Sequence, residues 1–430
     1  MAAPTESFSR NFWSHTAEAP PDTPPLLGAH RSDVTVIGGG YTGLSTALHL
    51  AKNGVNVRVL EAKQVGFGAS GRNNGQVIPA YSRHNPDDIE RIFGKDAGRN
   101  LNAWVASSAD LVFDLIRQYD IHCEAAQNGW LQPAHRPSRM KGVKKKQASW
   151  EATGQPTRLL TGEETIQLTG SPIYCHGGWV LERGGHIQPL GYARGLARAA
   201  IVEGAKVHGA SPAISVNRVE GYWRVETSAG YIDSDNLVFA TNGYTEALWP
   251  KLRQTIVPFR TFHAATSPIT DNIARSILPE NHGFSDTRQA LWAFRKDFGN
   301  RLITTAAPIV PLGAEGKINA STKARLLKVF PQIGDIEIEH IWQGWIAMTP
   351  ERLPRLHELA RGVFAGMGYS GRGIAMATAM GKSIADRISG ASLDTIGPLP
   401  VPIKVLPMHD VISPLSRAMI GVYRWKDNRD

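Results

Sequence analysis

The sequence predicts a mixed α/β protein: a Rossmann-like nucleotide-binding domain assembled from separated segments, together with a second domain that holds helices and a mainly antiparallel sheet. Three observations carry this prediction. A glycine-rich turn joins a strand to a helix near the start of the chain, a second glycine-rich turn precedes a helix near its end, and alternating apolar runs lie between them. With 430 residues, the chain is long enough for two to three domains or one elaborate α/β body.

Composition argues against several other classes of protein. Apolar residues make up 42% of the chain and charged residues 20%, which is ordinary globular usage. No window offers the roughly 18 uncharged apolar residues of a membrane-spanning helix, and residues 1–30 form a polar, proline-rich arm that we expect to be loose. Cys123 and Cys175 are too few for a disulfide framework and lack metal-ligand spacing, so a reducing cytoplasm is the expected location.

The charge balance suits more than one class of partner. Lys and Arg outnumber Asp and Glu by 47 to 38, and a net charge of +9 fits nucleic acid, anionic lipid, an acidic ligand or solubility alone. The densest basic stretch, residues 136–146, has no aromatic stacking platform or base-reading motif, so we interpret it as a solvated helix face and expect no nucleic-acid partner. The 14 histidines form no close-set ligand group, and no metal site is predicted.

The strongest signal is a strand–turn–helix–strand unit near the start of the chain. Residues 33–37 (DVTVI) predict a short buried strand, and residues 38–43 (GGGYTG) open a helix that runs to about residue 53. Residues 55–60 (VNVRVL) predict the next strand, which Glu61 closes. This is the arrangement in which a Rossmann-like domain binds a dinucleotide.

Each residue type in this unit has a physical role. Gly38 makes the tight turn, Gly40 lets the backbone approach a pyrophosphate, and Gly43 lets the helix pack closely on the strand. The amino end of the helix offers unpaired N–H groups and a positive dipole to the phosphates. Glu61 would accept hydrogen bonds from a ribose diol, and an acid at that place disfavours a 2′-phosphate.

The segment that follows is polar and rich in glycine. Residues 63–76 (KQVGFGASGRNNGQ) carry hydroxyl, amide and guanidinium donors directly after the ribose-binding acid. Such a segment suits a second phosphate and a polar ring. The structural alternative is an irregular surface loop.

These residues carry a family resemblance. The stretch DVTVIGGGYTGLSTALHLAKNGVNVRVLEAKQVGFGASGRNNGQV, residues 33–77, resembles the amino-terminal FAD-binding segment of the D-amino-acid oxidase superfamily. Its appearance is closest to the γ-glutamylputrescine oxidases and the related glycine/D-amino-acid (deaminating) and pipecolate oxidases. Later stretches extend the resemblance along most of the chain: HIQPL at 186–190, LVFATNG at 237–243, WQGW at 342–345 and FAGMGYSGRG at 364–373.

The resemblance implies which residues hold FAD. In the family, the late glycine-rich loop starts a helix whose amino end faces the flavin pyrimidine ring, and a helix dipole there would stabilise the charge of the reduced ring. Some relatives carry a lysine where this chain has Ala375, and some tether the flavin through a cysteine that residues 344–349 lack, so non-covalent FAD is expected. The implied cofactor-binding residues are Gly38, Gly40, Tyr41, Thr42, Gly43, Glu61, Ala62, Ser70, Gly71, Arg72, Asn73, Asn74, Gly75, Gln76, Ala213, Ala240, Thr241, Gly368, Tyr369, Ser370, Gly371, Arg372, Gly373 and Ile374.

The positions of these motifs predict a discontinuous domain organisation. We assign residues 31–82, 182–255 and 355–398 to the FAD-binding domain, and residues 83–181 and 256–354 to the substrate-binding domain. Residues 1–30 are the N-terminal arm. Residues 399–430 form an amphipathic tail whose apolar face would contain Ile412, Leu415, Met419, Val422 and Tyr423; it would dock on the protein's own surface or lie on the inner face of an anionic membrane.

The family's chemistry sets the expected function. The resemblance implies FAD-dependent oxidation of a CH–NH or CH–NH2 group of a small amine or amino acid, with oxygen as acceptor and hydrogen peroxide as product. The resulting imine would hydrolyse. Two alternatives stay open: a dehydrogenase that passes electrons to a quinone or partner protein, and a protein that binds FAD without turnover.

Candidate substrate contacts are Tyr81, Arg295, Trp345 and Tyr369. Arg295 ends an alternating run after two aromatic residues and would clasp a carboxylate, although a salt bridge or a surface position explains it equally simply. Core packing is the alternative for each aromatic residue. No catalytic residue is assigned, because an amine that enters deprotonated needs no general base. A γ-glutamylated polyamine, a cyclic secondary amino acid and an N-methyl amino acid all fit this frame.

Overall fold

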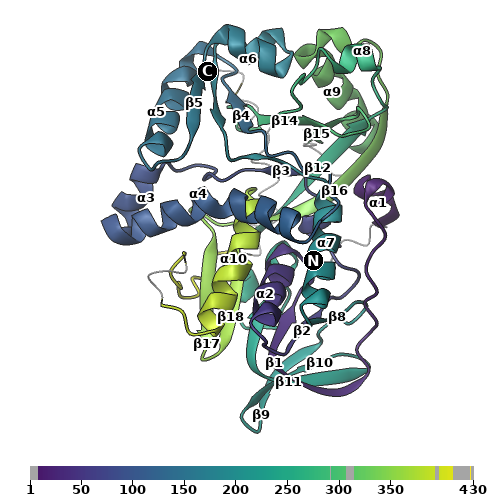
Figure 1. Cartoon of the computed structure of the whole chain (residues 1–430), viewed down its shortest axis with the longest axis vertical. Coiled ribbons are helices and arrows are strands. Elements are labelled where there is room, and N and C mark those ends of the chain that lie inside the picture. The colour runs from purple at the N-terminus through teal and green to yellow at the C-terminus, as the bar shows by residue number, and fades with distance from the viewer. Residues whose placement is uncertain (1–7, 291, 307–313, 393–396, 410–426, 428–430) are drawn as a thin grey trace.

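The computed structural model of the chain describes residues 8–290, 292–306, 314–392 and 397–409, together with Asp427. Its strands form two eight-stranded sheets and one two-stranded sheet within these ranges. Figure 1 shows the large sheets in opposite halves of the molecule, with the long helix α4 (Lys95–Gln118) running between them. The predicted mixed α/β fold, with a mainly antiparallel second sheet, is confirmed.

The first sheet is largely parallel and has the order β17-β18-β11-β1-β2-β8, with the β9–β10 hairpin attached to β11. β1 pairs in parallel with β2 and β11, and β2 pairs in parallel with β8. The sheet draws on chain segments far apart in sequence: β1 (Gly28–Ile37), β2 (Val57–Leu60), β8 (Lys206–His208), β9 (Ser215–Val219), β10 (Tyr222–Glu226), β11 (Gly230–Phe239), β17 (Arg355–Ala360) and β18 (Val363–Met367).

Three helices cover one face of this sheet. α2 (Tyr41–Lys52) packs between α7 (Pro189–Val202) and α10 (Gly373–Ile388), as Figure 1 shows. All three helices bury apolar residues in one core with β1 and β2. Both faces of β1 are buried at its carboxyl end, residues 34–37, and this run is apolar apart from Thr35, as expected for a strand inside a parallel sheet.

The second sheet has the order β16-β12-β15-β14-β13-β4-β6-β5, and all but one of its pairings are antiparallel. Its strands are β4 (Trp130–Pro133), β5 (Thr157–Leu160), β6 (Gly178–Leu181), β12 (Val257–Thr266), β13 (Gly283–Ser285), β14 (Ala293–Lys296), β15 (Leu302–Ala306) and β16 (Ile338–Met348). The small sheet pairs β3 (Gln76–Val77) with β7 (Gly185–His186). The other helices are α3 (Pro86–Phe93), α5 (Met140–Glu151), α6 (Gly162–Thr169), α8 (Asp271–Ala274) and α9 (Ala314–Val329).

The N-terminal arm departs from the expectation of a loose segment. It contains the 3-10 helix η1 (Phe8–Arg10) and the short helix α1 (Trp13–Thr16), and Asn11, Phe12 and Trp13 are all at most 1% exposed. β1 also begins five residues earlier than predicted, at Gly28. The expectation of a loose arm failed because it relied on the polar, proline-rich composition of residues 1–30, which a short aromatic segment hardly changes.

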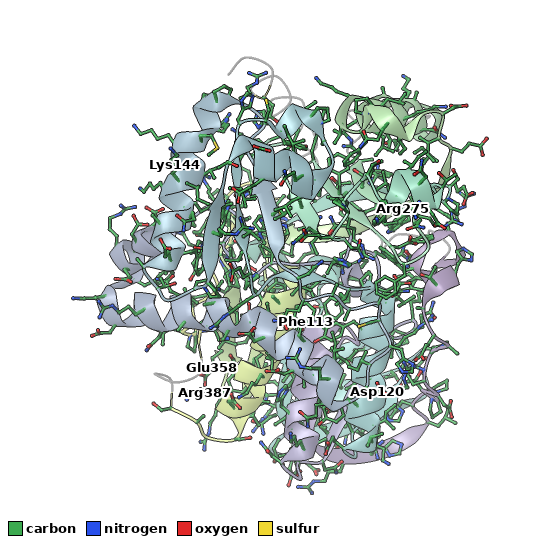
Figure 2. All side chains as sticks on the ribbon, turned by 45° about the horizontal axis from the view of Figure 1, so that its top comes forward. Phe113, Asp120, Lys144, Arg275, Glu358 and Arg387 are labelled. Carbon is green, nitrogen blue, oxygen red and sulfur yellow. The ribbon has the colours of Figure 1, made fainter. Side chains whose placement is uncertain are left out.

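The basic run and the tail were also singled out from sequence. Lys141, Lys144 and Lys145 of α5 are exposed, and Figure 2 shows Lys144 pointing outward, so this part of the run is a solvated helix face. The predicted apolar face of the tail, residues 412–423, lies outside the described residues. None of the helices in the described part of the chain combines the length and apolar character that a membrane crossing demands.

Candidate functional site

A cavity of about 1540 Å³ opens where the two large sheets meet. Its wall includes the carboxyl ends of β1, β2 and β11, the amino ends of α2 and α10, and residues of β12 and β16. Ligands of open α/β sheets bind outside the carboxyl ends of the parallel strands. Pockets for small ligands usually have volumes of about 300–1,000 Å³, so this cavity has room for a dinucleotide and a further small molecule.

The first glycine-rich turn is tightly packed beneath the cavity. Gly38 has φ of 114°, and a Cβ there would lie 2.8 Å from the carbonyl oxygen of Ala240. A Cβ on Gly43 would lie 2.0 Å from the carbonyl oxygen of Gly38. Both positions therefore require glycine, which brings α2 onto the ends of β1 and β11.

Glu61 is held rigidly at the end of β2. Its two carboxylate oxygens accept hydrogen bonds from the backbone N–H groups of Gly39 (2.8 Å) and Lys63 (2.9 Å). Burial raises the pKa of Glu61, whereas these N–H groups lower it. Because each oxygen has further acceptor capacity and Glu61 lines the cavity, its carboxylate is placed to receive donors from a ligand.

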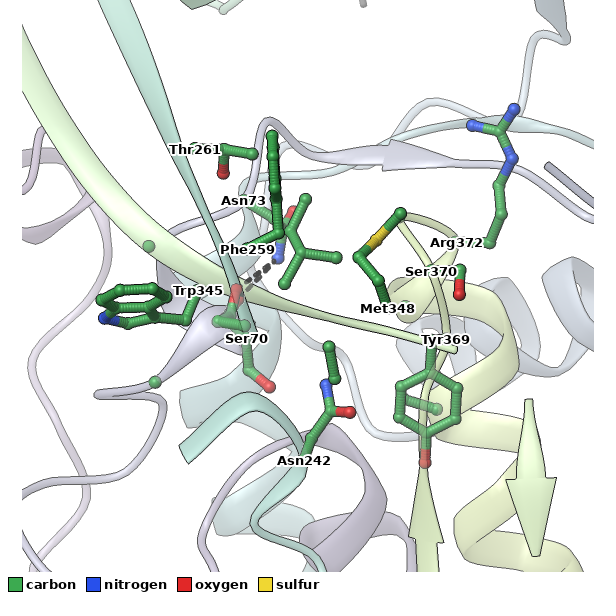
Figure 3. A pocket seen from close by; sticks show the side chains of 18 of the residues that line it. Ser70, Asn73, Asn242, Phe259, Thr261, Trp345, Met348, Tyr369, Ser370 and Arg372 are labelled. Atoms are coloured by element: carbon green, nitrogen blue, oxygen red, sulfur yellow. Dashed lines mark hydrogen bonds between the residues drawn. The ribbon is translucent and has the colours of Figure 1, made fainter. Parts of the chain in front are cut away.

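The polar segment after β2 folds back over the start of α2. Ser70 Oγ accepts a hydrogen bond from the backbone N–H of Tyr41 at 3.0 Å. Asn73 Nδ2 donates to the carbonyl oxygen of Ser70 at 2.9 Å, and Asn73 Oδ1 accepts from the N–H of Gly75 (Figure 3). The amide of Gln76 bonds to Trp130, Ser285, Phe284 and Phe294, so this side chain joins the segment to the second sheet.

The late glycine-rich loop reaches the same cavity from the other side. Tyr369 shares a 2.6 Å hydrogen bond with the hydroxyl of Thr42 in α2, and Asn242 Oδ1 accepts from the N–H of Gly368 at 3.0 Å. The guanidinium of Arg372 lies over the ring of Trp130 at 5.2 Å. Burial lowers the pKa of Arg372 to about 10, and its Nε is buried without a hydrogen-bond partner in the described structure.

Two helix amino ends therefore face one cavity. The N-cap residues of α2 and α10 make no side-chain hydrogen bond to their helices, and neither helix has an acidic residue in its first turn. Ser70 satisfies only the N–H of Tyr41 in α2. The first N–H groups of a helix need acceptors, and phosphate or a polar ring edge can supply them. Together with Glu61, this donor and acceptor set fits a dinucleotide.

The far end of the cavity is formed by the second sheet. Val257, Phe259, Thr261 and His263, alternate residues of β12, line the wall, so one face of that strand looks into the cavity. Met348 of β16 stands beside them, and Figure 3 shows Phe259 and Met348 around the same space. These apolar groups can exclude water from a reacting centre. Trp345 also lines the cavity, but strand alternation directs its ring to the other face of β16.

His263 is a buried polar group in this wall. It stacks on Trp342 with ring centroids 5.6 Å apart, and its Nδ1 has no hydrogen-bond partner among the described residues. Burial lowers the pKa of His263 to about 4. The imidazole is therefore neutral at pH 7.

An ion pair lies at the polar end of the cavity. Asp286 accepts from the side chain of Arg288 and, at 3.0 Å, from the hydroxyl of Tyr174. Arg288 also lies over the ring of Trp292 at 4.0 Å. Burial raises the pKa of Asp286 to about 6, although Arg288 opposes the shift. The charged side chains around the whole cavity are mainly basic: Lys63, Arg72, Arg83, Arg139, Arg288, Arg352 and Arg372 against Glu61, Glu246 and Asp286.

Most of the predicted cofactor-binding residues line this one cavity. They are Gly38, Gly40, Tyr41, Thr42, Glu61, Ala62, Ser70, Arg72, Asn73, Asn74, Gln76, Ala213, Ala240, Thr241, Tyr369, Ser370, Gly371, Arg372, Gly373 and Ile374. Four glycines lie behind the wall, where an added Cβ would contact other chain segments: Gly43, Gly71, Gly75 and Gly368.

Two of the four predicted substrate contacts lie away from the wall. Tyr81 is 1% exposed, donates its hydroxyl to Asn102 at 2.9 Å and stacks on Trp150. Arg295 is fully buried, donates to the carbonyl oxygen of Ile187 and lies 3.8 Å from Glu124. Both side chains are engaged inside the protein, so we do not carry their predicted substrate contact further. Trp345 and Tyr369 do line the cavity.

Sequence reasoning missed several lining residues. The alternation of Val257, Phe259, Thr261 and His263 in β12 was a readable strand signal, but it does not say which face meets the cavity. Asp286, Thr287 and Arg288 come from the loop after β13, and no local pattern points to them. Arg139 ends the 3-10 helix Pro137–Arg139 and belongs to the basic stretch 136–146, whose composition predicts a solvated helix face.

Comparison with known proteins identifies the family. The model of the DAO family, described as FAD dependent oxidoreductase, matches residues 33–387. The chain belongs to the DAO family of FAD-dependent oxidoreductases. It is 31% identical over 359 residues to γ-glutamylputrescine oxidoreductase of Escherichia coli, covering 83% of this chain and 84% of that protein. It is also 30% identical over 397 residues to a probable oxidoreductase OrdL of Rhizobium meliloti, covering 91% of each.

The solved structures agree with this DAO-family fold. Glycine oxidase from Geobacillus kaustophilus superposes with a TM-score of 0.70 at 19% identity, covering 84% of this chain and 96% of that one. The DAO-family resemblance read from the glycine-rich motifs is thus confirmed.

A contact between Asp427 and the polar end of the cavity leads to a testable prediction for this DAO-family protein. The carboxylate of Asp427 accepts hydrogen bonds from the backbone N–H groups of Gln289 (3.0 Å) and Ala290 (2.9 Å), both of which line the cavity. Because hydrogen bonds to a charged group are each worth about 1.5–3 kcal/mol, Asp427→Ala should speed hydrogen exchange of these two amides about tenfold. The exposed Asp335, paired with Lys323, gives the control Asp335→Ala, which should leave them unchanged. Equal exchange in both variants would contradict the prediction.

Proposed function

We propose that the protein oxidises the CH–NH or CH–NH2 group of a small amine or amino acid to an imine, which water hydrolyses, and that oxygen accepts the electrons and becomes hydrogen peroxide. Membership of the DAO family and the similarity to γ-glutamylputrescine oxidoreductase support this reaction class. A γ-glutamylated polyamine, a cyclic secondary amino acid or an N-methyl amino acid are the substrate classes to test.

The observation that carries the proposal is the continuity of the cavity. A single space extends from Glu61, at the nucleotide end, to Arg288 in the loop between β13 and β14. A dinucleotide held by its ribose at Glu61 would leave the polar end for a second molecule. A protein that only stored FAD would have no need of that further room.

The proposed FAD contacts follow from the cavity wall. Glu61 would hold the ribose, the amino end of α2 and Ser70 the pyrophosphate, and the loop 369–374 the flavin. FAD supplies a two-electron acceptor when bound. Neither Cys123 nor Cys175 lines the cavity, which supports non-covalent binding.

The second sheet would bind and orient the substrate. Phe259 and Met348 would exclude water from the reacting carbon. The neutral His263 can donate or accept a hydrogen bond without adding charge. The excess of arginines favours a substrate that carries a carboxylate in addition to its amine.

The purified yellow protein should lose its flavin absorbance when mixed anaerobically with a suitable amine or amino acid. A panel should contain the three substrate classes above. Admission of air should restore the absorbance and release peroxide in stoichiometric amount. Reduced flavin that is stable in air would indicate that the protein is not an oxidase but a dehydrogenase that passes electrons to a quinone or a partner protein. If no compound in a broad panel reduces the flavin, the protein binds FAD without turnover.

A further inference from the structure

The N-terminal staple, defined here as residues 8–18, lies directly against the polar segment 67–76. Phe8 stacks on Phe67 with centroids 5.5 Å apart, and the guanidinium of Arg72 lies over both rings. Phe12 and Trp13 pack on Trp342 of β16. Figure 1 shows α1 beside α7 and β16, outside both large sheets.

Side chains of the staple bind the backbone of this segment. Asn11 Nδ2 donates to the carbonyl oxygen of Gly71 at 2.6 Å, and Trp13 Nε1 donates to that of Asn73 at 2.8 Å. Between them, the carbonyl oxygen of Arg72 accepts from Trp342 Nε1 at 2.8 Å. Three successive carbonyl groups are thus fixed by buried side chains, and none of the donor residues lines the cavity.

Two of these three residues also face the cavity with other groups. Arg72 and Asn73 line its wall, as does the next residue, Asn74. The segment contains Gly68, Gly71 and Gly75, and so many glycines leave a free backbone with many conformations. The hydrogen bonds to its carbonyl groups select one of these backbone conformations. The selected conformation sets the direction of the side chains that face the nucleotide.

The staple is itself anchored. Gln188 Nε2 donates to the carbonyl oxygen of Trp13 at 3.1 Å, and Arg198 pairs with Glu18 at 2.6 Å. Arg194 donates to the carbonyl oxygen of Glu18. All three partners lie at or within α7, which packs on α2. The staple therefore ties the segment 67–76 to the helix layer of the first sheet.

We propose that Asn11 and Trp13 are positioning residues for FAD: by holding the carbonyl groups of Gly71 and Asn73, they preorganise the segment 67–76 for the cofactor before it binds. This goes beyond the proposed function, since it concerns FAD capture and not the substrate. Preorganisation lowers the entropy lost on binding and so raises affinity.

Trp13→Phe tests the proposal with little loss of packing, because it keeps an aromatic ring and removes the N–H donor. Trp104→Phe is the matched control: Trp104 Nε1 donates to Ser383 at 3.0 Å, and Trp104 does not line the cavity. Trp13→Phe should raise the dissociation constant of FAD about fivefold, the effect of one lost hydrogen bond, and Trp104→Phe should leave it unchanged.

Hydrogen exchange of the apoprotein gives a second readout without cofactor or substrate. The amides of residues 67–76 should exchange severalfold faster in Trp13→Phe than in Trp104→Phe. Asn11→Ala removes the other bond and leaves the aromatic rings in place, so it should act in the same direction even if Trp13→Phe folds poorly. Unchanged FAD affinity and unchanged exchange in both staple variants would overturn the proposal. Absence of amine oxidation would count only against the proposed function.

Discussion

Gly43→Ala is expected to weaken FAD binding at least tenfold. A Cβ at this position would lie 2.0 Å from the carbonyl oxygen of Gly38, where ordinary contact begins near 3.4 Å, so α2 would have to move by roughly 1.4 Å. The move would displace the amino end of the helix and Thr42 from the cavity wall. We expect about 3 kcal/mol lower free energy of unfolding, the upper range for overpacking, and at least a tenfold higher dissociation constant for FAD.

Gly142→Ala is the matched control for this change. Gly142 lies in α5, and a Cβ there would have no atom within 4 Å. Alanine should stabilise that helix by about 0.5–1 kcal/mol and leave FAD binding unchanged. Urea unfolding of the apoprotein and FAD titration measure the two effects separately. Gly43→Ala protein that binds FAD normally would contradict the packing argument.

The nucleotide end was predictable because its signals are local. The strand, turn, helix and acid from residue 33 to Glu61 are contiguous, and the late loop at 368–373 carries its own glycine pattern. Gly38 and Gly43 are each required by contacts within a short stretch or at one crossing of chains. Local spacing is therefore enough to find such a site, and the confirmed family follows from it.

The substrate end depends on contacts between distant residues. Arg295 looked like a carboxylate ligand because it follows two aromatic residues, yet its strand position buries it against Ile187 and Glu124. Arg288 carries no motif but reaches the cavity through a loop anchored by Asp286 and Asp427. Strand alternation gives two faces, and only tertiary packing decides which face meets the ligand.

The prediction of a loose N-terminal arm failed for a related reason. Proline-rich, polar composition predicts a loose end, but Phe12 and Trp13 bury their rings. Asn11 and Trp13 also donate hydrogen bonds to residues 60 positions away. A few aromatic side chains can order a segment whose average composition is polar, because each of them buries a large apolar area.

Acid should destabilise the protein through its buried histidines. Burial lowers the pKa of His263 to about 4 and, with help from Arg295, that of His186 to about 3. An unfolded histidine titrates near pH 6.5, so below that pH the unfolded state binds more protons and stability falls as pH drops toward the folded pKa. At about 1.4 kcal/mol per pKa unit, His263 alone should lose on the order of 3 kcal/mol between pH 6.5 and 4.

The difference between wild type and His263→Gln isolates this contribution, because all other groups titrate in both proteins. Urea unfolding at pH 7 and pH 4 should show that the variant loses about 3 kcal/mol less than wild type. Asp286→Asn provides a control of opposite sign. Burial raises the pKa of Asp286 to about 6, so the ionised carboxylate destabilises the folded state above that pH, and protonation removes this destabilisation as pH falls. The Asn variant should therefore lose more stability than wild type over the same interval. Equal pH dependence in all three proteins would mean that neither side chain is buried in solution as it is in this structure, and the polar end of the cavity would then be open to water.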